Sequence, residues 1–431
     1  MKKLIFLISA SIFLGCNKTS KTESSKVNHA TLLVATEGHI FNFNLDENKM
    51  AWQYKSAIDS AGNRNLFTLD GQNIFMPFES GKLINFDINS GKIIWQQQIY
   101  GNGDQPLDMS NDENEEAKRL SSKMPLFMAK PLVDGQNILM ASTGHPSEVS
   151  SAWLYNFNKA DGTKNWLSEL PTIYNYFAPV KYRNSYFVNS AVFLEKLSAQ
   201  NGVNTSYGMF DGDVEIAGQP LQHNEVNQFE RPLYNQMYTD GNTLFIGSET
   251  GTIYALSLDK DGNLPNGDIS DPNNTFIKNP KVFKWIYKND KLVAKRSHIL
   301  FFENGTLYTE MRISSNTESN LLAINAEDGN LEWGQILPPD VLNWTISHGK
   351  IIGNNANTLF YIDTNGKNFT KVKIKDKPLS GIESIDATHF VYVTQKGIEI
   401  FDTQTQAARL IIAKGFNDNE YNNLQIKYIS K

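Results

Sequence analysis

The sequence predicts an all-β fold, a single β-propeller of eight four-stranded blades, with seven blades as the alternative. The first observation behind this prediction is turn chemistry. The 431 residues include 47 Asn, 29 Gly and 15 Pro, and so many turn-forming residues favour short strands over long helices. The second is a recurring unit of alternating apolar residues, an Asp/Asn-Gly turn and a closing aromatic side chain, with about the 40–50-residue period of propeller blades.

The clearest copy of this unit is residues 73–99, which reads as three strands separated by two Gly-containing turns. Five of the seven Trp residues close such a unit: Trp52, Trp95, Trp166, Trp285 and Trp333. We expect these rings to pack between adjacent blades, because a Trp ring buries a large area and its N–H can reach a neighbouring carbonyl. Trp153 and Trp344 lie off this position and are expected to be exposed. The pattern places the eight units at residues 31–55, 63–100, 126–170, 173–210, 233–290, 298–337, 344–375 and 382–413.

The two ends of the repeat region complement each other. The first unit begins at Thr31 with a run that matches the second strand of the other units, so its innermost strand is missing. Residues 423–429 form a strand-like run that has no turn partner. We predict that this run completes the first blade and closes the ring, because closure removes exposed sheet edges.

The N-terminus has the pattern of a targeting segment, followed by a tether. Two Lys residues precede the apolar run 4–14, which has signal-peptide length and is too short for a membrane span. The predicted organisation is a signal peptide at residues 1–15, a polar tether at 16–30 and a propeller domain at 31–431. Cys16 is the only Cys, so no intrachain disulfide or Cys-based metal cluster can form.

The tripeptide Leu14-Gly15-Cys16 resembles the lipobox of bacterial lipoproteins. This resemblance implies cleavage before Cys16 and acylation of Cys16 with chains such as palmitate, which would anchor the protein stably in a membrane. In lipoprotein sorting, an Asp after the acylated Cys retains the protein at the inner membrane. Asn17 stands there instead, so the resemblance implies the outer membrane, with the body facing the periplasm. Exposure at the cell surface is the alternative.

Two blade units carry a family resemblance. Gly251-Thr-Ile-Tyr-Ala-Leu and Leu322-Ala-Ile-Asn-Ala each lead into an Asp-Gly turn, and they resemble the pyrroloquinoline-quinone-type propeller repeat. The resemblance covers most of residues 31–413. Combined with the lipobox, the pattern is similar to the scaffold lipoproteins of the outer-membrane β-barrel assembly machinery. It therefore implies a non-enzymatic scaffold that binds a protein partner in the cell envelope and takes part in outer-membrane protein assembly.

The alternative function is a propeller enzyme or binding protein for a small ligand such as a saccharide, with its site at the central channel. An enzyme is the less favoured reading. No residue is assigned a catalytic or cofactor-binding role, and no cofactor is expected. The alcohol-oxidising quinoproteins of this repeat use a vicinal Cys pair, which a single Cys cannot supply. The formal net charge of −6 gives no electrostatic case for nucleic-acid binding.

One segment resembles the start of a calcium loop, with oxygen-bearing side chains at Asp259, Asp261, Asn263 and Asp268. Calcium loops also need a Gly at the sixth position and a Glu at the twelfth, where this chain has Leu264 and Ser270. The segment coincides with a blade turn, in which Asp and Asn are common without any metal. It is therefore a weak candidate, and no metal site is assigned. The seven His residues have no metal-binding spacing either.

Two long connections are candidate partner-binding loops. Residues 104–116 form an acidic insert, and residues 208–232 mix apolar and charged side chains. Long connections in compact folds are commonly functional.

Overall fold

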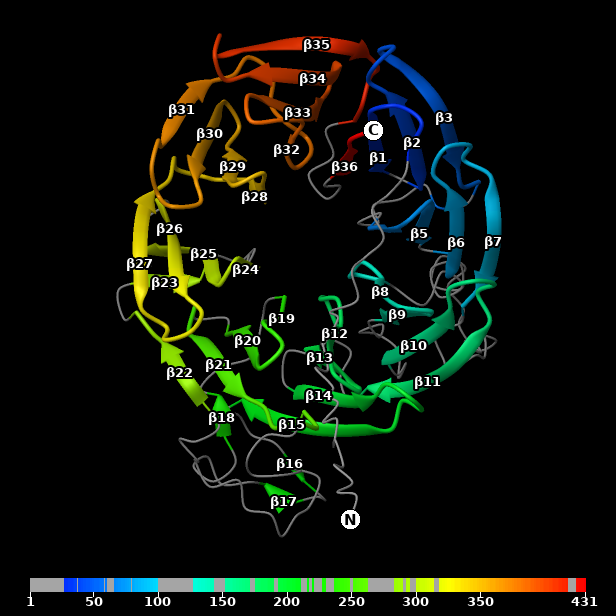
Figure 1. Cartoon of the computed structure of the whole chain (residues 1–431), viewed down its shortest axis with the longest axis vertical. Helices are drawn as coiled ribbons and strands as arrows, with labels where there is room; N and C mark the ends of the chain where they lie inside the picture. The colour runs from blue at the N-terminus through cyan, green and yellow to red at the C-terminus, as the bar shows by residue number, and fades with distance from the viewer. Residues whose placement is uncertain are drawn as a thin grey trace, which may run out of the picture.

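The fold is that of a computed structural model. It describes residues 27–431 apart from residues 37, 58, 60–65, 79, 100–126, 143–151, 171–174, 190–192, 211–214, 217–218, 221–226, 230–235, 249–250, 263–282, 290–291, 295–299, 314–317 and 418–423. Eight antiparallel blades stand in a ring around a central axis (Figure 1), which confirms the predicted all-β propeller and its eight blades. A short β-hairpin, β16 (Glu215–Ile216) with β17 (Gln219–Pro220), forms a separate small sheet.

Each of the first four blades begins with a strand at the axis and ends with a strand at the rim. Blade 1 consists of β36 (Gln425–Ile429), β1 (Thr31–Thr36), β2 (His39–Asn44) and β3 (Lys49–Lys55). Blade 2 consists of β4 (Thr68–Asp70), β5 (Asn73–Pro77), β6 (Lys82–Asp87) and β7 (Ile93–Gln98). Blade 3 consists of β8 (Leu132–Asp134), β9 (Asn137–Ala141), β10 (Ala152–Asn158) and β11 (Lys164–Leu170). Blade 4 consists of β12 (Val180–Tyr182), β13 (Ser185–Asn189), β14 (Phe193–Ser198), β15 (Asn204–Phe210) and a fifth strand, β18 (Asn227–Phe229).

The other four blades follow the same plan. Blade 5 consists of β19 (Tyr238–Thr239), β20 (Thr243–Gly247), β21 (Ile253–Ser257) and β22 (Phe283–Tyr287). In blade 6, β23 (Leu292–Ala294) and β24 (Leu300–Glu303) both pair with β25 (Thr306–Ile313), followed by β26 (Ser319–Asn325) and β27 (Leu331–Ile336). Blade 7 consists of β28 (Asn343–Ser347), β29 (Lys350–Asn354), β30 (Thr358–Asp363) and β31 (Thr370–Lys373). Blade 8 consists of β32 (Glu383–Ser384), β33 (His389–Thr394), β34 (Gly397–Asp402) and β35 (Ala407–Ala413).

The C-terminal strand closes the ring, as the sequence predicts. β36 pairs antiparallel with β1 from Thr31↔Ile429 to Ala35↔Gln425, so the innermost strand of blade 1 comes from the far end of the chain (Figure 1). A parallel bridge between Ser380 and Leu424 joins the same segment to blade 8. The C-terminal segment is thus held by hydrogen bonds on both sides of the closure.

The hydrophobic core is divided among the gaps between blades. The described buried side chains form eight clusters, each of which lies between two adjacent blades. The central strands are therefore buried on both faces, as β6 shows with Leu83, Ile84 and Phe86 all fully buried. A blade cannot bury both faces alone, so each blade depends on its two neighbours.

The five Trp side chains that close the repeats all lie against a turn Gly of the next blade. Trp95 is half-buried, and its Nε1 donates to the carbonyl of Lys159 at 3.0 Å. A Cβ on Gly162, where φ is +74°, would come within 2.6 Å of this ring. The same contact joins Trp52 to Gly91, Trp166 to Gly202, Trp285 to Gly329 and Trp333 to Gly366. Gly is thus required twice, by its backbone angle and by the approach of the ring.

The expectation that Trp344 is exposed was wrong. Trp344 lies on β28, the inner strand of blade 7, and only 4% of its surface is accessible. Its Nε1 donates to Glu310 at 3.0 Å, and its ring meets Phe301 edge-on with centroids 5.0 Å apart. The expectation failed because inner strands also face the neighbouring blade. Trp153, the other Trp off the repeat position, is half-buried against the core between blades 2 and 3.

Blade 8 contains a buried carboxyl group that predicts a pH-dependent stability. Glu399 is 5% exposed, and burial raises the pKa of its carboxyl group, opposed by a hydrogen bond from Thr394. Nearby Asp376 raises this pKa further, whereas the hydrogen bond from Tyr392 and the charge of Lys396 lower it. Because the folded state holds the proton more tightly than the unfolded state, stability is lost as the pH rises from the unfolded pKa through the folded pKa.

We therefore expect Glu399→Gln to remove this loss. The amide keeps the shape of the side chain and carries no charge, so it cannot ionise in the buried site. Urea unfolding at pH 4 and pH 7 should give a variant that is more stable than the parent at pH 7 and gains little or nothing at pH 4. A variant less stable at pH 7 would mean that the two hydroxyl donors need the ionised carboxylate.

Candidate functional site

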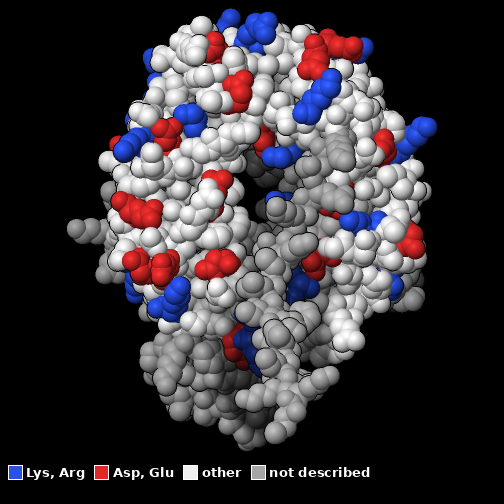
Figure 2. Space-filling view, viewed as in Figure 1, with Lys and Arg blue, Asp and Glu red and all other residues white. Residues whose placement is uncertain are grey.

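The inner strands of the eight blades surround a central hollow, and its mouth carries charged side chains. The space-filling view shows acidic and basic groups beside this hollow (Figure 2). Propeller channels commonly hold ligands, since side chains from several blades converge there. The channel mouth is therefore where polar groups from distant segments of the chain can meet.

An ion pair joins two inner strands at the closure of the ring. Lys427 of β36 lies with its Nζ 3.0 Å from Oε2 of Glu383 on β32. The Lys427 side chain is 49% exposed, and the Glu383 carboxylate is 17% exposed. An exposed pair of this kind contributes less than about 1 kcal/mol to stability. Its amine and carboxylate are therefore of interest as binding groups and not as a source of stability.

Lys130 adds a second amine to this region. It is accessible to water, but the surrounding protein desolvates its ammonium group and so lowers its pKa. The positive charge of Lys427 lowers the pKa further, and the negative charge of Glu383 opposes the shift. We name Lys130, Lys427 and Glu383 the channel-mouth cluster. With two amines and one carboxylate, the cluster carries an excess positive charge when both amines are protonated, and an anionic group could neutralise this charge.

Hydrogen bonds hold the backbone around this cluster. Gln425 of β36 accepts from the Phe67 N–H at 2.8 Å and donates to the Phe67 carbonyl at 3.2 Å, which joins blade 1 to blade 2. Thr68 Oγ1 donates to the carbonyl of Pro131 at 2.5 Å, which joins blade 2 to the segment after Lys130. The channel mouth is thus built on a fixed frame, as precise binding sites need.

A polar pocket of about 430 Å³ lies between blades 5 and 6. Asp240, Glu327 and Glu332 contribute carboxylates to it, and Lys284 contributes an amine. At the matching place between blades 2 and 3, Lys159 pairs with Asp70 at 2.6 Å. Ala326 occupies the position that Lys159 has in blade 3, so it brings no amine to the carboxylates of the pocket. Its shallow, mostly polar lining indicates a solvated gap in the interface.

The structure describes only part of the calcium candidate. Asp259 and Asp261 lie in a turn, in which the Asp261 N–H donates to Asp259 Oδ1 at 2.8 Å. This contact is the usual Asx-turn role of an Asp. Asn263 and Asp268 lie outside the described residues. Among the described residues no group of three or more His, Cys, Asp or Glu side chains is placed to hold a metal ion.

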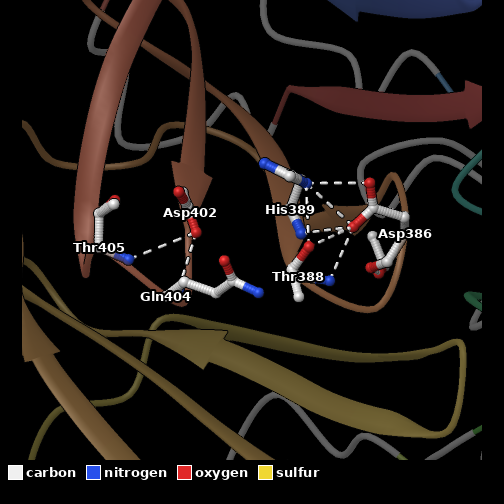
Figure 3. Close-up of polar contacts among 7 residues, drawn as sticks. Asp386, Thr388, His389, Asp402, Gln404 and Thr405 are labelled. Atoms are coloured by element: carbon white, nitrogen blue, oxygen red, sulfur yellow. Dashed lines mark hydrogen bonds and ion pairs between the residues drawn. The ribbon is translucent and has the colours of Figure 1, made fainter.

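His389 lies between two acidic turns of blade 8 (Figure 3). Its Nδ1 is 2.9 Å from Oδ2 of Asp386. The other carboxylate oxygen, Oδ1, accepts hydrogen bonds from the backbone N–H groups of Thr388 and His389. Burial raises the pKa of Asp386, but these hydrogen bonds outweigh it and lower the pKa to about 2. Asp402 caps the other turn through the Gln404 N–H at 2.7 Å. The arrangement stabilises turns and does not gather a ligand set.

The outer strands form the second candidate surface. Within the described sheets, each blade ends at the rim of the ring in a strand with one free edge, except that β18 covers the edge of β15 in blade 4. Large apolar side chains are exposed on several of them, among them Ile93, Ile94, Ile286, Leu331 and Ile336. Free edges and exposed apolar side chains are the features that extended peptide segments recognise.

Besides Asn263 and Asp268, several sequence predictions fall outside the described residues: the signal peptide 1–15, the lipidation site Cys16, most of the tether 16–30, the acidic insert 104–116 and most of the connection 208–232. The described residues contain no helix with the length and hydropathy that a membrane span needs. Sequence reasoning missed the channel-mouth cluster altogether. No local signal could have found it, because Glu383 and Lys427 lie 44 residues apart, Lys130 lies about 250 to 300 residues before them, and the three meet only through ring closure.

The chain is similar to known propellers at low sequence identity. The family described as outer membrane protein assembly factor BamB matches residues 20–117. BamB from Moraxella catarrhalis is 12% identical, with a TM-score of 0.53 over 87% of this chain and 91% of that one. Apo AztD from Citrobacter koseri is 13% identical, with a TM-score of 0.56 over 93% and 98%. No curated protein sequence matches the chain significantly.

Redox enzymes share the same architecture. Quinohemoprotein alcohol dehydrogenase ADHIIG from Pseudomonas putida is 10% identical, with a TM-score of 0.53 over 88% of this chain and 71% of that one. Because identities this low establish the fold alone, enzymes and assembly factors are equally compatible with the ring. The repeat sequence, the matched family and the eight-bladed ring together make this chain a propeller of pyrroloquinoline-quinone-like repeats, similar to BamB.

Proposed function

We propose that the protein is a lipid-anchored scaffold of the outer membrane that faces the periplasm and binds a protein partner during outer-membrane protein assembly. The observation that carries this proposal is the rim of the ring. In several blades the outer strand has a free edge among the described strands and also carries an exposed isoleucine or leucine. The match of residues 20–117 to an outer membrane assembly factor supports the same function. A rigid ring with free edges binds extended segments without any catalytic group.

Anchoring through Cys16 is the first testable part of the proposal. We expect Cys16→Ser to move the protein from the membrane pellet to the soluble periplasmic fraction, because acyl chains would no longer hold it. Fractionation followed by immunoblotting measures the change, and Asn17→Asp serves as a control that keeps acylation intact. A Cys16→Ser protein that still pellets in high salt would contradict the lipid anchor.

Partner binding is tested by purification of tagged full-length protein from detergent-solubilised envelopes. We expect one envelope protein to co-purify at a fixed ratio to the propeller and to remain bound after a wash with high salt, because edge pairing relies on main-chain hydrogen bonds and apolar contact. The channel-mouth variant Lys130→Gln/Lys427→Gln should retain the partner to the same extent. Recovery of the propeller alone under all detergents would contradict the scaffold.

A second candidate function is the binding of a small anionic ligand, and the channel-mouth cluster favours it. The amines of Lys130 and Lys427, with only the carboxylate of Glu383 beside them, would bind a carboxylate or phosphate group of a ligand. Titration calorimetry with inorganic phosphate and with glucuronate tests this candidate, using Lys130→Gln/Lys427→Gln as the control. Binding that the double variant abolishes would favour the ligand function over the scaffold.

A further inference from the structure

The eight outer strands differ in charge, and charge governs whether a free strand edge can pair with another chain. Charged side chains on an edge strand oppose pairing with another chain. Six of the outer strands carry at least one Lys, Arg, Asp or Glu, and these are β3, β11, β22, β27, β31 and β35. The other two, β7 (IIWQQQ) and β15 (NTSYGMF), carry none.

The structure treats these two uncharged edges differently. β15 is covered by β18, which adds a parallel strand through the pairs Met209↔Asn227 and Phe210↔Phe229. β7 is the last strand of its sheet, and no strand that the structure describes lies beyond it. The fold itself therefore shows that an outer edge of this ring accepts an added strand, and it covers one of its two uncharged edges in this way.

The start of β7 also exposes two apolar side chains. Ile93 and Ile94 are 43% and 51% exposed. The register with β6 shifts between Asn85 and Phe86, opposite the start of β7, and then runs without interruption from Asn85↔Trp95 to Lys82↔Gln98. The last four residues thus form a regular edge, and no strand that the structure describes pairs with its outward N–H and C=O groups.

We propose that β7 is the docking site of the scaffold, where an extended, uncharged segment of a partner protein adds a fifth strand to blade 2. This inference rests on the proposed function and names the surface that performs it. An uncharged segment is required because β7 offers isoleucines, glutamines and main-chain groups but no ion-pairing partner. Main-chain hydrogen bonds would provide the affinity, and the exposed isoleucines would select apolar side chains.

The position of Ile94 makes a sharp test. Ile94 directly precedes the rim Trp95, and the residues that directly precede Trp285 and Trp333 are the exposed Lys284 and Glu332. Ile94→Lys therefore installs a charge that two other blades already carry at this position, so the variant should fold. Ile94→Thr is the neutral counterpart, because Thr favours strands and leaves the edge uncharged. Ala51→Lys, which directly precedes Trp52 on β3, is the matched control on a charged edge.

The experiment places a photo-crosslinking amino acid at Gln96 on β7, in full-length protein in the cell, and at Gln53 on β3 as a control. Each of these glutamines is exposed and directly follows its Trp. We expect Gln96, and not Gln53, to crosslink to a second protein at a segment that mass spectrometry maps to uncharged, alternating apolar residues. Ile94→Lys should reduce the crosslink about tenfold, Ile94→Thr should reduce it much less because the edge stays uncharged, and Ala51→Lys should leave it unchanged.

Three outcomes would overturn this assignment. Crosslinks from Gln96 to a second copy of the chain, or to another segment of the same chain, would give β7 a different occupant. If Ile94→Lys crosslinks as strongly as the parent, the partner does not bind by pairing with the β7 edge. If a partner co-purifies but Gln96 does not crosslink to it, the docking site lies elsewhere and the scaffold function still holds. If no partner co-purifies, the proposed scaffold function itself fails.

Discussion

Deleting residues 420–431 should lower the melting temperature sharply or cause aggregation, although chain ends are usually dispensable. The deletion removes β36, which forms five residue pairs with β1, together with the buried side chains of Leu424, Ile426 and Ile429. The loss exposes the inner edge of β1 and opens the core between blades 8 and 1. An open ring also has unprotected edges that favour aggregation. Calorimetry and light scattering on purified protein measure both effects.

A circular permutant separates the strand from the chain end. Because β36 runs antiparallel to β1 with Ile429 opposite Thr31, residues 424–431 can be joined through a short loop ahead of Val27 to form a hairpin. We expect this permutant to recover most of the stability that the deletion loses. A deleted protein that melts within about a degree or two of the parent would contradict ring closure by β36.

Replacing Trp95 or Trp333 with Ala should cost about 3 kcal/mol of unfolding free energy, the lower end of the range for large aromatic residues because both rings are half-buried. Each variant loses a hydrogen bond to the next blade, from Trp95 Nε1 to Lys159 at 3.0 Å or from Trp333 Nε1 to Thr364 at 3.1 Å. Each also leaves a gap above Gly162 or Gly366. Denaturant unfolding measures the loss.

Trp344→Ala provides the comparison. Trp344 is more deeply buried and leaves Glu310 without its indole donor, so we expect a loss at least as large as at the two rim positions. Trp153 is half-buried, and its Nε1 has no hydrogen-bond partner among the described residues, so Trp153→Ala should cost less. Equal and small losses at all four positions would contradict this packing of the blades.

The repeat features of the fold could be predicted from the sequence because they recur. The turn Gly and the rim Trp mark the same place in five blades, and the lone C-terminal run fits the one blade that lacks a strand. The units without a Trp also coincide with blades of the structure, because turn residues separate their strands as they do in the marked units. In blade 4, which has no rim Trp, a Cβ on the turn Gly262 of blade 5 would come within 3.2 Å of Tyr182 on the inner strand, so a Tyr lies against this Gly instead.

What the sequence could not predict depends on contacts between distant segments. The burial of Trp344 follows from the position of its strand beside blade 6, which no repeat motif encodes. The channel-mouth cluster needs the closed ring to bring Lys427 to Glu383. The contrast between β7 and β15 depends on which outer strand β18 covers, and this pairing has no signal in the repeat.

The most direct test of the scaffold is the assembly of outer-membrane barrels in cells that lack this protein. Folded barrels are counted by their altered gel migration without heating, and complementation uses the parent or Lys130→Gln/Glu383→Gln/Lys427→Gln. We expect the deletion to reduce the folded fraction and the channel-mouth variant to restore it as fully as the parent, because binding occurs at the rim and not in the channel. Unchanged barrel assembly in the deletion strain, or a channel-mouth variant that folds normally yet fails to restore assembly, would contradict the account.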